Sequence, residues 1–474
     1  MTYPIQVRLR DLERTHNDYE LYRDAWQTLD DFRQGPAIVA AKAAHYLPRR
    51  PGEPAEAYNH RLSKFVYTPV VATAIREFVS ELVSAPLYLE GTQGPWWTKW
   101  LTRIDGYRMD LTRFVTEVFS HLLFFGRVYV SIDTPRGPGR SLAESSDPYI
   151  LIYPATQVIN WGEGWYLSRQ VAWRTEPLEE PKQVLQFTYW CRDGIRRYEW
   201  TKGAYAQLVA EVPTSECRMV CLQVPGYLWA GNNLYLKQLE HLWIESAWVE
   251  SGSVAGIVQR IFTPQAPVAL DDPRVLYQAP ELPKFDSQHI LVGQDYRVVE
   301  STGAALGSLQ SQLDTIERQV RHLVSMGYAR DAQATSGLSK EYDRSIQEYT
   351  MRDYGLQVVQ LVQAVFQVVA RSAGMPDDIS CQGLDSYSLD NLGSMVDITG
   401  KLIPFADGLP QTTQKVWVSK LSRLMTGTLS RQDEQQLAQE LEDIYQAKGD
   451  VSPDTNGRGN LAGDPSPDDR DDDQ

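Results

Sequence analysis

The sequence predicts an α+β protein that is mainly helical. Along 304–327 apolar residues recur three and four positions apart, a spacing typical of helices, and a second long helix is expected over 340–374. Between 127 and 225 the pattern changes to short alternating or β-branched runs separated by turn residues, which predicts strands. At 474 residues the chain exceeds what one hydrophobic core usually organises, so two or more domains are expected.

The composition restricts the classes of function. A hydrophobic content of 42% with 13 Trp, 25 Tyr and 12 Phe indicates a well-packed body. The formal net charge of -15 argues against a protein that wraps nucleic acid by neutralising phosphates. The four cysteines are too few for a disulfide framework, and the N-terminus carries no secretory signal. The longest apolar run, about fifteen residues, is shorter than the roughly 20 that span a bilayer, so we expect no transmembrane helix.

The N-terminal half reads as helices followed by strands. Residues 1 to 60 are polar and helical in pattern, and Thr68-Pro69 is expected to open a helix, with Thr68 as N-cap. Two further helices are expected at 96–104 and 109–126, the second ending at Gly126. The expected strands lie within 127–133, 148–161, 168–176, 183–191, 196–203, 205–213 and 218–225.

Two long helices are expected to pair. The second, 304–327, carries an apolar stripe of Leu306, Leu309, Leu313, Ile316, Val320 and Leu323. The first, 232–262, is expected to offer Leu236, Leu239 and Trp243 to that stripe. The proline-broken segment 263–303 between them is predicted to be irregular, with one or two short strands at the tip of a helical hairpin.

The C-terminal part begins with another long helix. A short polar loop, 328–339, precedes it, and its second half, Leu356 to Ala370, is apolar around most of its circumference, as in a buried helix. Three shorter helices are expected between 388 and 448. The last segment, 450–474, has eight Asp and two Arg and is predicted to be a disordered acidic tail.

The sequence carries no recognisable set of catalytic, cofactor-binding or metal-ligating residues. The segment from Gly393 to Lys401 has the wrong spacing for a phosphate-binding loop. Cys217 and Cys221 lack nearby histidines that would complete a zinc site. The seven histidines form no metalloprotease pattern, and no serine lies in a nucleophile elbow. We therefore expect a protein that is not an enzyme and has no cofactor.

At this level the chain resembles the portal proteins of tailed bacteriophages. The local similarity lies in DLTRFVTEVFSHLLFFGRVYVSIDTP, where a helix ends in Leu-x-x-Gly-Arg before a strand ending in Asp, in PYILIYPATQVINW, and in STGAALGSLQSQLDTIERQV. The order of parts over almost the whole chain is similar too. The resemblance implies a ring-forming fold with a wing (1–231), first stem helix (232–262), clip (263–303), second stem helix (304–327), tunnel loop (328–339), long wing helix (340–374), crown (375–449) and acidic tail (450–474).

The resemblance also implies a function and partners. It implies a homododecamer at one capsid vertex of the virion, assembled in the host cytoplasm, through which double-stranded DNA passes without sequence specificity during packaging and ejection. The implied partners are the terminase large subunit, a head-tail adaptor and the major capsid protein, with no membrane. By their place in the tunnel loop, Arg330, Asp331, Gln333, Thr335 and Ser336 are candidates to lie near DNA.

A conduit must let DNA slide, and a lysine-lined wall would retain it through phosphate contacts. We therefore hypothesise that the exposed face of the second stem helix lines the channel with Gln310, Asp314, Glu317 and Arg318. One alternative is another head-tail connector or minor capsid protein, although these usually lack two long helices around a proline-rich tip. A metal-dependent nuclease is the other, but it would need clustered carboxylates, which are not apparent.

Overall fold

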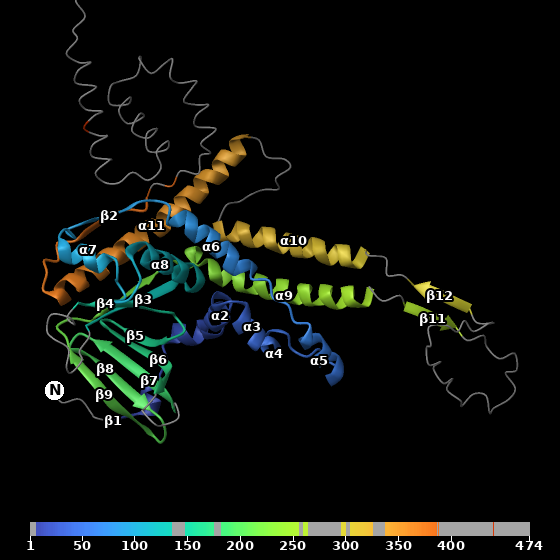
Figure 1. Cartoon of the computed structure of the whole chain (residues 1–474), viewed down its shortest axis with the longest axis horizontal. Helices are drawn as coiled ribbons and strands as arrows, with labels where there is room; N and C mark the ends of the chain where they lie inside the picture. The colour runs from blue at the N-terminus through green and yellow to red at the C-terminus, as the bar shows by residue number, and fades with distance from the viewer. Residues whose placement is uncertain are drawn as a thin grey trace, which may run out of the picture. The chain divides into compact units, whose positions relative to one another are not determined.

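The computed structural model describes residues 6–134, 147–174, 182–255, 259–263, 295–299, 304–325, 337–385, 387 and 439. These residues form helices and antiparallel sheets (Figure 1), and the α+β class is confirmed. The chain divides into two compact units, Met1–Ser388 and Leu389–Gln474, and nearly all of the described residues belong to the first.

The N-terminal segment is helical, as the sequence predicts, except for a short strand at its start that was not predicted. The elements are β1 Gln6–Arg8, α1 Leu9–Leu12, α2 Asn17–Gln34, α3 Pro36–Ala41, α4 Ala43–Tyr46 and α5 Ala55–Ser63. The His16 ring caps α2 by accepting a hydrogen bond from the amide of Asp18. The helix ends at Gly35, whose φ of 104° favours glycine.

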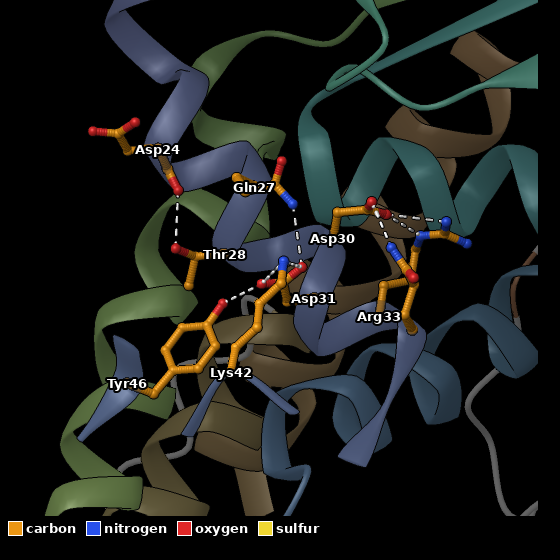
Figure 2. A network of polar contacts seen from close by, with 9 residues as sticks. Asp24, Gln27, Thr28, Asp30, Asp31, Arg33, Lys42 and Tyr46 are labelled. Carbon is orange, nitrogen blue, oxygen red and sulfur yellow. Dashed lines mark hydrogen bonds and ion pairs between the residues drawn. The ribbon is translucent and has the colours of Figure 1, made fainter. Parts of the chain in front are cut away.

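A buried carboxylate holds α2 to the two helices that follow it. Asp31 is 1% exposed and accepts hydrogen bonds from the Lys42 ammonium at 2.8 Å and from the Tyr46 hydroxyl (Figure 2). Burial and the bond to this carboxylate raise the pKa of Tyr46. Because Asp31 satisfies both polar groups, Tyr46 can lie in an apolar cluster with Phe32 and with Leu242 of the long helix α9 Ala230–Ala255.

The next helices form the centre of the first unit. They are α6 Val70–Leu82, α7 Pro95–Leu101 and α8 Leu111–Phe125, with β2 Leu87–Glu90 between α6 and α7. The buried face of α6 includes Val71, Ala74, Ile75, Phe78 and Leu82. The expectation that Thr68 caps α6 is wrong, because the helix starts one residue later and has no side-chain cap of its own. The Thr68 hydroxyl instead donates to Glu245 of α9 at 2.6 Å.

The junction between α8 and the first long strand explains the Gly-Arg pair of the resemblance. Gly126 ends α8 in the left-handed region at φ 67°, and a Cβ there would lie 2.6 Å from the Trp229 ring. Arg127 then turns inward, lies 4.3 Å over the ring of Trp161 and donates to Gln223. A helix, two sheets and a loop thus meet at these two residues.

The β-rich block contains all seven runs that the sequence predicts as strand. The strands are β3 Arg127–Asp133, β4 Tyr149–Tyr153, β5 Val158–Gly162, β6 Trp165–Arg174, β7 Lys182–Cys191, β8 Gly194–Trp200, β9 Tyr205–Pro213 and β10 Met219–Gln223. Within the described residues they form a sheet of order β1-β9-β8-β7-β6-β5 and a second of order β10-β3-β4. A 3-10 turn, Gly226–Leu228, leads out of the block.

The two sheets face each other through aromatic side chains. Tyr129 of β3 contacts Tyr166 of β6 with ring centroids 5.9 Å apart, and Tyr153 of β4 contacts Trp190 of β7 at 5.3 Å. The alternate residues of β3 are buried on the opposite side, where α8 and the helix α11 Gly337–Ala373 contact the strand. β3 is therefore a central strand covered on both faces, and its sequence is apolar almost throughout.

The longest helix, α11 Gly337–Ala373, runs through the core of this unit. Tyr354, Val358, Val362 and Phe366 are fully buried, and the Phe366 ring stacks on Trp97 of α7. By length and composition Gln347–Ala373 could cross a membrane, contrary to the expectation from the sequence. Contacts with α6, α8, β3, β10 and β13 within the same chain account for this apolar character.

A short strand, β13 Ser380–Gly383, pairs with β2 and was not predicted. The residues after it close back onto α11, because a Cβ at Gly355 would lie only 1.7 Å from the carbonyl oxygen of Leu384. Leu384 itself has a φ of 52°. The first compact unit therefore extends to Ser388, beyond the boundary expected near 375.

The remaining elements form a long hairpin. They are α9 Ala230–Ala255, β11 Gln259–Thr263, β12 Asp295–Val299 and α10 Ala304–Ser325. The expectation of one helix over 232–262 is wrong at its C-terminal end, where β11 replaces it. The β-branched and aromatic residues there, QRIFT, suit a strand, and β12 supplies the backbone partner.

Candidate functional site

The hairpin of α9 and α10 is the candidate functional site. The two helices lie side by side (Figure 1) and are linked through the antiparallel strands β11 and β12. Two contacts give their register. His241 of α9 lies beside Glu317 of α10, and a Cβ on Gly252 would lie 4.0 Å from Leu306. These positions are 252 − 241 = 11 and 317 − 306 = 11 residues apart, so the helices run antiparallel without slippage.

The inner face of α10 is the apolar stripe that the sequence predicts. Leu313, Ile316 and Val320 are buried, and Leu306, Leu309 and Leu323 are half-buried. By the register above, Ile316 lies level with Leu242 of α9, which is fully buried. Helix α6 also contacts both helices. The stripe is thus the core of a three-helix contact.

The prediction that Leu236, Leu239 and Trp243 of α9 face α10 is wrong. Leu236 and Trp243 are 58% and 50% exposed, and Leu239 packs toward the cluster around Tyr46. The face that meets α10 and the start of α6 instead carries Gln238, His241 and Glu245. Because α9 has apolar residues on several sides, hydrophobic spacing alone could not select among them.

Gln238 and Glu245 hold the N-terminal end of α6. The Gln238 side chain is fully buried, accepts a hydrogen bond from the Val71 amide and donates to the Thr68 carbonyl, both at 2.9 Å. Glu245 accepts from the Thr68 amide and hydroxyl. Side chains of α9 thus satisfy backbone groups at a helix start that has no cap of its own.

His241 lies between two carboxylates. Its Nδ1 is 3.7 Å from Glu245, one turn along α9, and its Nε2 is 3.6 Å from Glu317 on α10. The imidazole is 2% exposed and neither ring nitrogen makes a hydrogen bond within the described residues. The ring therefore places a buried polar group of α9 beside a carboxylate of α10, and this proximity depends on the register of the two helices.

The candidate channel-lining residues differ in position. Gln310, Asp314 and Arg318 lie on the exposed side of α10, and the Gln310 amide donates to Asp314. Glu317 faces His241. With Arg321, the charges of α10 sum to 2 − 2 = 0, whereas α9 carries Lys237 against Glu240, Glu245 and Glu250, or 1 − 3 = −2. The acidity of the hairpin therefore comes from α9 and not from the helix that was expected to supply it.

The candidate tunnel-loop residues Arg330, Asp331, Gln333, Thr335 and Ser336 lie outside the described residues. Helix α11 begins at Gly337, so the last three positions of the expected loop are helical. In the part of the chain that the structure describes, no group of three or more His, Cys, Asp or Glu side chains could hold a metal ion.

Sequence reasoning missed Gln238, His241 and Glu245. Their signal was present as polar residues at positions 238, 241 and 245, three and four apart. Such spacing indicates a polar face, which is usually solvated. Only the neighbouring elements show that it is buried against backbone groups of α6 and a carboxylate of α10.

No protein-family model matches the chain, and no curated protein matches it. Among solved structures, similar chains come from gene transfer agent (GTA) particles. One, from the virion of a native GTA particle, has 14% identity and a TM-score of 0.38 and covers 81% of this chain and 98% of that chain. A second, from the neck of an empty GTA particle computed with C6 symmetry, has 13% identity and a TM-score of 0.37 (85% and 97% coverage). A third, from the neck of a native GTA particle computed with C12 symmetry, has 12% identity and a TM-score of 0.37 (85% and 99%). These three chains are components of the virion or neck of such particles.

Proposed function

We propose that this chain is a portal protein, a subunit of a ring at one capsid vertex through which double-stranded DNA passes. The observation that carries the proposal is the hairpin: two long helices pair antiparallel, without slippage, and continue into an antiparallel ribbon. A bundle of such hairpins around an axis is a way to build a rigid channel wall. The sequence resemblance to portal proteins supports the same assignment.

In this proposal the parts have separate tasks. Helices α9 and α10 are the stem, β11, β12 and the residues between them are the clip, and 1–231 with α11 is the wing. The ring is a dodecamer in the virion, assembled in the host cytoplasm. Its clip meets the terminase large subunit during packaging and a head-tail adaptor afterwards, and its wing meets the major capsid protein.

The charge of the chain suits a conduit. A net charge of -15 gives DNA phosphates few sites of lasting attachment, because tight binding would require many cations that release counterions. The neutral surface of α10 and the acidic surface of α9 both favour sliding over retention. No sequence-specific contact with DNA is required of any residue.

Imaging of the purified full-length chain tests the proposal. We expect mass photometry to show a ring-sized species and negative-stain averages to show rotational symmetry with an axial hole that admits a duplex. Solid particles without an axial hole at every concentration would contradict a portal. Closed rings that fail to associate with a cognate terminase would favour the alternative, another head-tail connector.

A packaging assay tests the channel surface. Asp314→Lys places a cation on the exposed side of α10, and we expect slower DNA translocation, with the defect relieved by added salt. Glu163→Lys is the matched control, because it changes the net charge equally at a side chain that is 97% exposed in the wing. Equal translocation by both variants would show that this side of α10 does not line the channel.

A further inference from the structure

Two exposed apolar pairs remain on helices of the first unit. On α9, Leu236 is 58% and Trp243 50% exposed, and on α11, Tyr349 is 67% and Leu356 41% exposed. Each pair is seven residues apart, which places its members on one side of their helix about 10 Å apart. We call these the α9 patch and the α11 patch. Neither patch is covered by the described residues.

The α9 patch and the α11 patch are different surfaces of the subunit. The two apolar residues of each patch are separated by the same distance along their helix. A closed ring needs a heterologous interface, in which one surface of each subunit meets a different surface of the next. A self-complementary patch would instead form a twofold dimer and stop. The pairing of one α9 patch with one α11 patch has the form that a ring requires.

Charged residues lie between the two apolar residues of each patch, and they favour one relative orientation of the two helices. Glu240 lies four residues after Leu236, and Arg352 lies four residues before Leu356. If the two helices cross antiparallel, Leu236 meets Leu356, Trp243 meets Tyr349, and Glu240 faces Arg352. A parallel arrangement would instead set Glu240 against Asp353, because each follows the first apolar residue of its pair by four.

The remaining charges fit the same arrangement. Lys237 forms an ion pair with Glu240 at 2.9 Å on α9, so the α9 patch carries a cation beside an anion. Arg352 and Asp353 are exposed and make no ion pair within the described part of the chain. In the antiparallel arrangement Glu240 faces Arg352, and Lys237 lies level with Gly355, within one helical turn of Asp353.

We infer that the α9 patch of one subunit binds the α11 patch of the next subunit, antiparallel, and that this contact closes the ring. The inference rests on the proposed function, since a ring is its premise, and it names the surfaces that join neighbouring copies. It also explains why the apolar face of α9 expected to meet α10 is turned away from that helix.

Two single variants test the contact. Leu236→Glu disables the α9 patch and Tyr349→Glu disables the α11 patch, both at exposed positions where the fold tolerates a charge. Each variant alone should lose rings. Mixed together they should form a one-to-one dimer and nothing larger, because only one functional α9 patch and one functional α11 patch remain per pair. Native mass spectrometry measures these species.

A charge exchange tests the orientation. Glu240→Arg and Arg352→Glu should each reduce ring formation at least roughly tenfold, and the double variant should restore it, because every interface then carries the reversed pair. Leu21→Glu, at a leucine of α2 that is 71% exposed, is the control for an added charge and should form rings.

The outcomes separate this inference from the proposed function. Rings formed by Leu236→Glu or Tyr349→Glu alone, with rings also formed by the unaltered chain, would overturn the inference and leave the portal assignment standing. Homodimers of a single variant would also overturn it. An unaltered chain that forms no ring under any condition would contradict both.

Discussion

The Nε2 atom of His241 on α9 lies 3.6 Å from Oε1 of Glu317 on α10, inside the pairing of the two long helices. The ring is almost fully buried, and its other nitrogen faces Glu245. A polar residue buried between helices favours one register, because sliding either helix separates it from its partner. Besides its apolar stripe, the hairpin therefore has a buried polar residue that favours one register of the two helices.

The two acidic residues of α10 should respond differently to charge reversal. Glu317→Lys replaces a carboxylate beside buried His241 by a cation, and we expect it to lower the free energy of unfolding by about 1–3 kcal/mol. Asp314→Lys, at an exposed position, should change stability by less than about 0.5 kcal/mol. Urea denaturation of both variants measures the difference. Equal destabilisation would contradict the separate roles of these residues.

Gln238 is expected to be essential for the junction of α6 and α9. Gln238→Leu keeps a similar volume but leaves the Val71 amide and the Thr68 carbonyl without partners, and each buried unpaired group costs about 1–3 kcal/mol. Gln238→Glu retains the acceptor for Val71 but sets a buried carboxylate against the Thr68 carbonyl oxygen, so it should lose at least as much. Thermal unfolding at neutral pH compares them. A leucine variant as stable as the unaltered chain would show that these backbone groups find water instead.

The parts of the fold that the sequence predicts are those with one strong local signal. The stripe from Leu306 to Leu323 has mostly polar residues on the rest of its helix, which favours burial of one face. Gly126 marks a helix end because glycine readily adopts the left-handed conformation found there. The strands of the β block are predictable because apolar and polar residues alternate along them and turn residues separate them.

The parts that could not be predicted depend on distant partners. Trp243 looks like a core residue, yet it is half-exposed and its indole donates to the Tyr46 carbonyl. Thr68 lies where a helix cap is expected. Its hydroxyl instead donates a hydrogen bond to Glu245, 177 residues away in the sequence. Strands β2 and β13 are four residues each and become strands only by pairing. The residue types and spacings along the chain give no information on these contacts.

Gly355 should not tolerate a side chain. A Cβ there would lie 1.7 Å from the carbonyl oxygen of Leu384 and 2.9 Å from the hydroxyl of Tyr387, which donates to the Leu82 carbonyl. Gly355→Ala must therefore displace the segment that follows β13. We expect a loss of about 1–3 kcal/mol, as for other overpacked cores, and faster proteolysis after residue 383. Denaturation and limited proteolysis measure the two effects.

Gly307 on α10 is the matched control for this substitution. A Cβ at Gly307 meets nothing within 4 Å, so Gly307→Ala should stabilise the helix by about 0.5–1 kcal/mol through the lower backbone entropy of alanine. Opposite signs for the two Gly→Ala changes are the expected result. A neutral effect at Gly355 would mean that the Leu384 segment moves aside without cost.

His121 on α8 should make the protein sensitive to acid. Burial, with a smaller effect of Arg33, lowers its pKa from 6.5 to about 3. Between these values the unfolded chain binds a proton that the folded chain does not, so stability falls as the pH falls, by up to about 1.4 kcal/mol per pH unit. His121→Met should flatten this dependence between pH 6.5 and pH 3, and the same change at the exposed His60 should not. Denaturation curves across that range measure the slope, and an unaltered slope in His121→Met would mean that other groups carry the acid response.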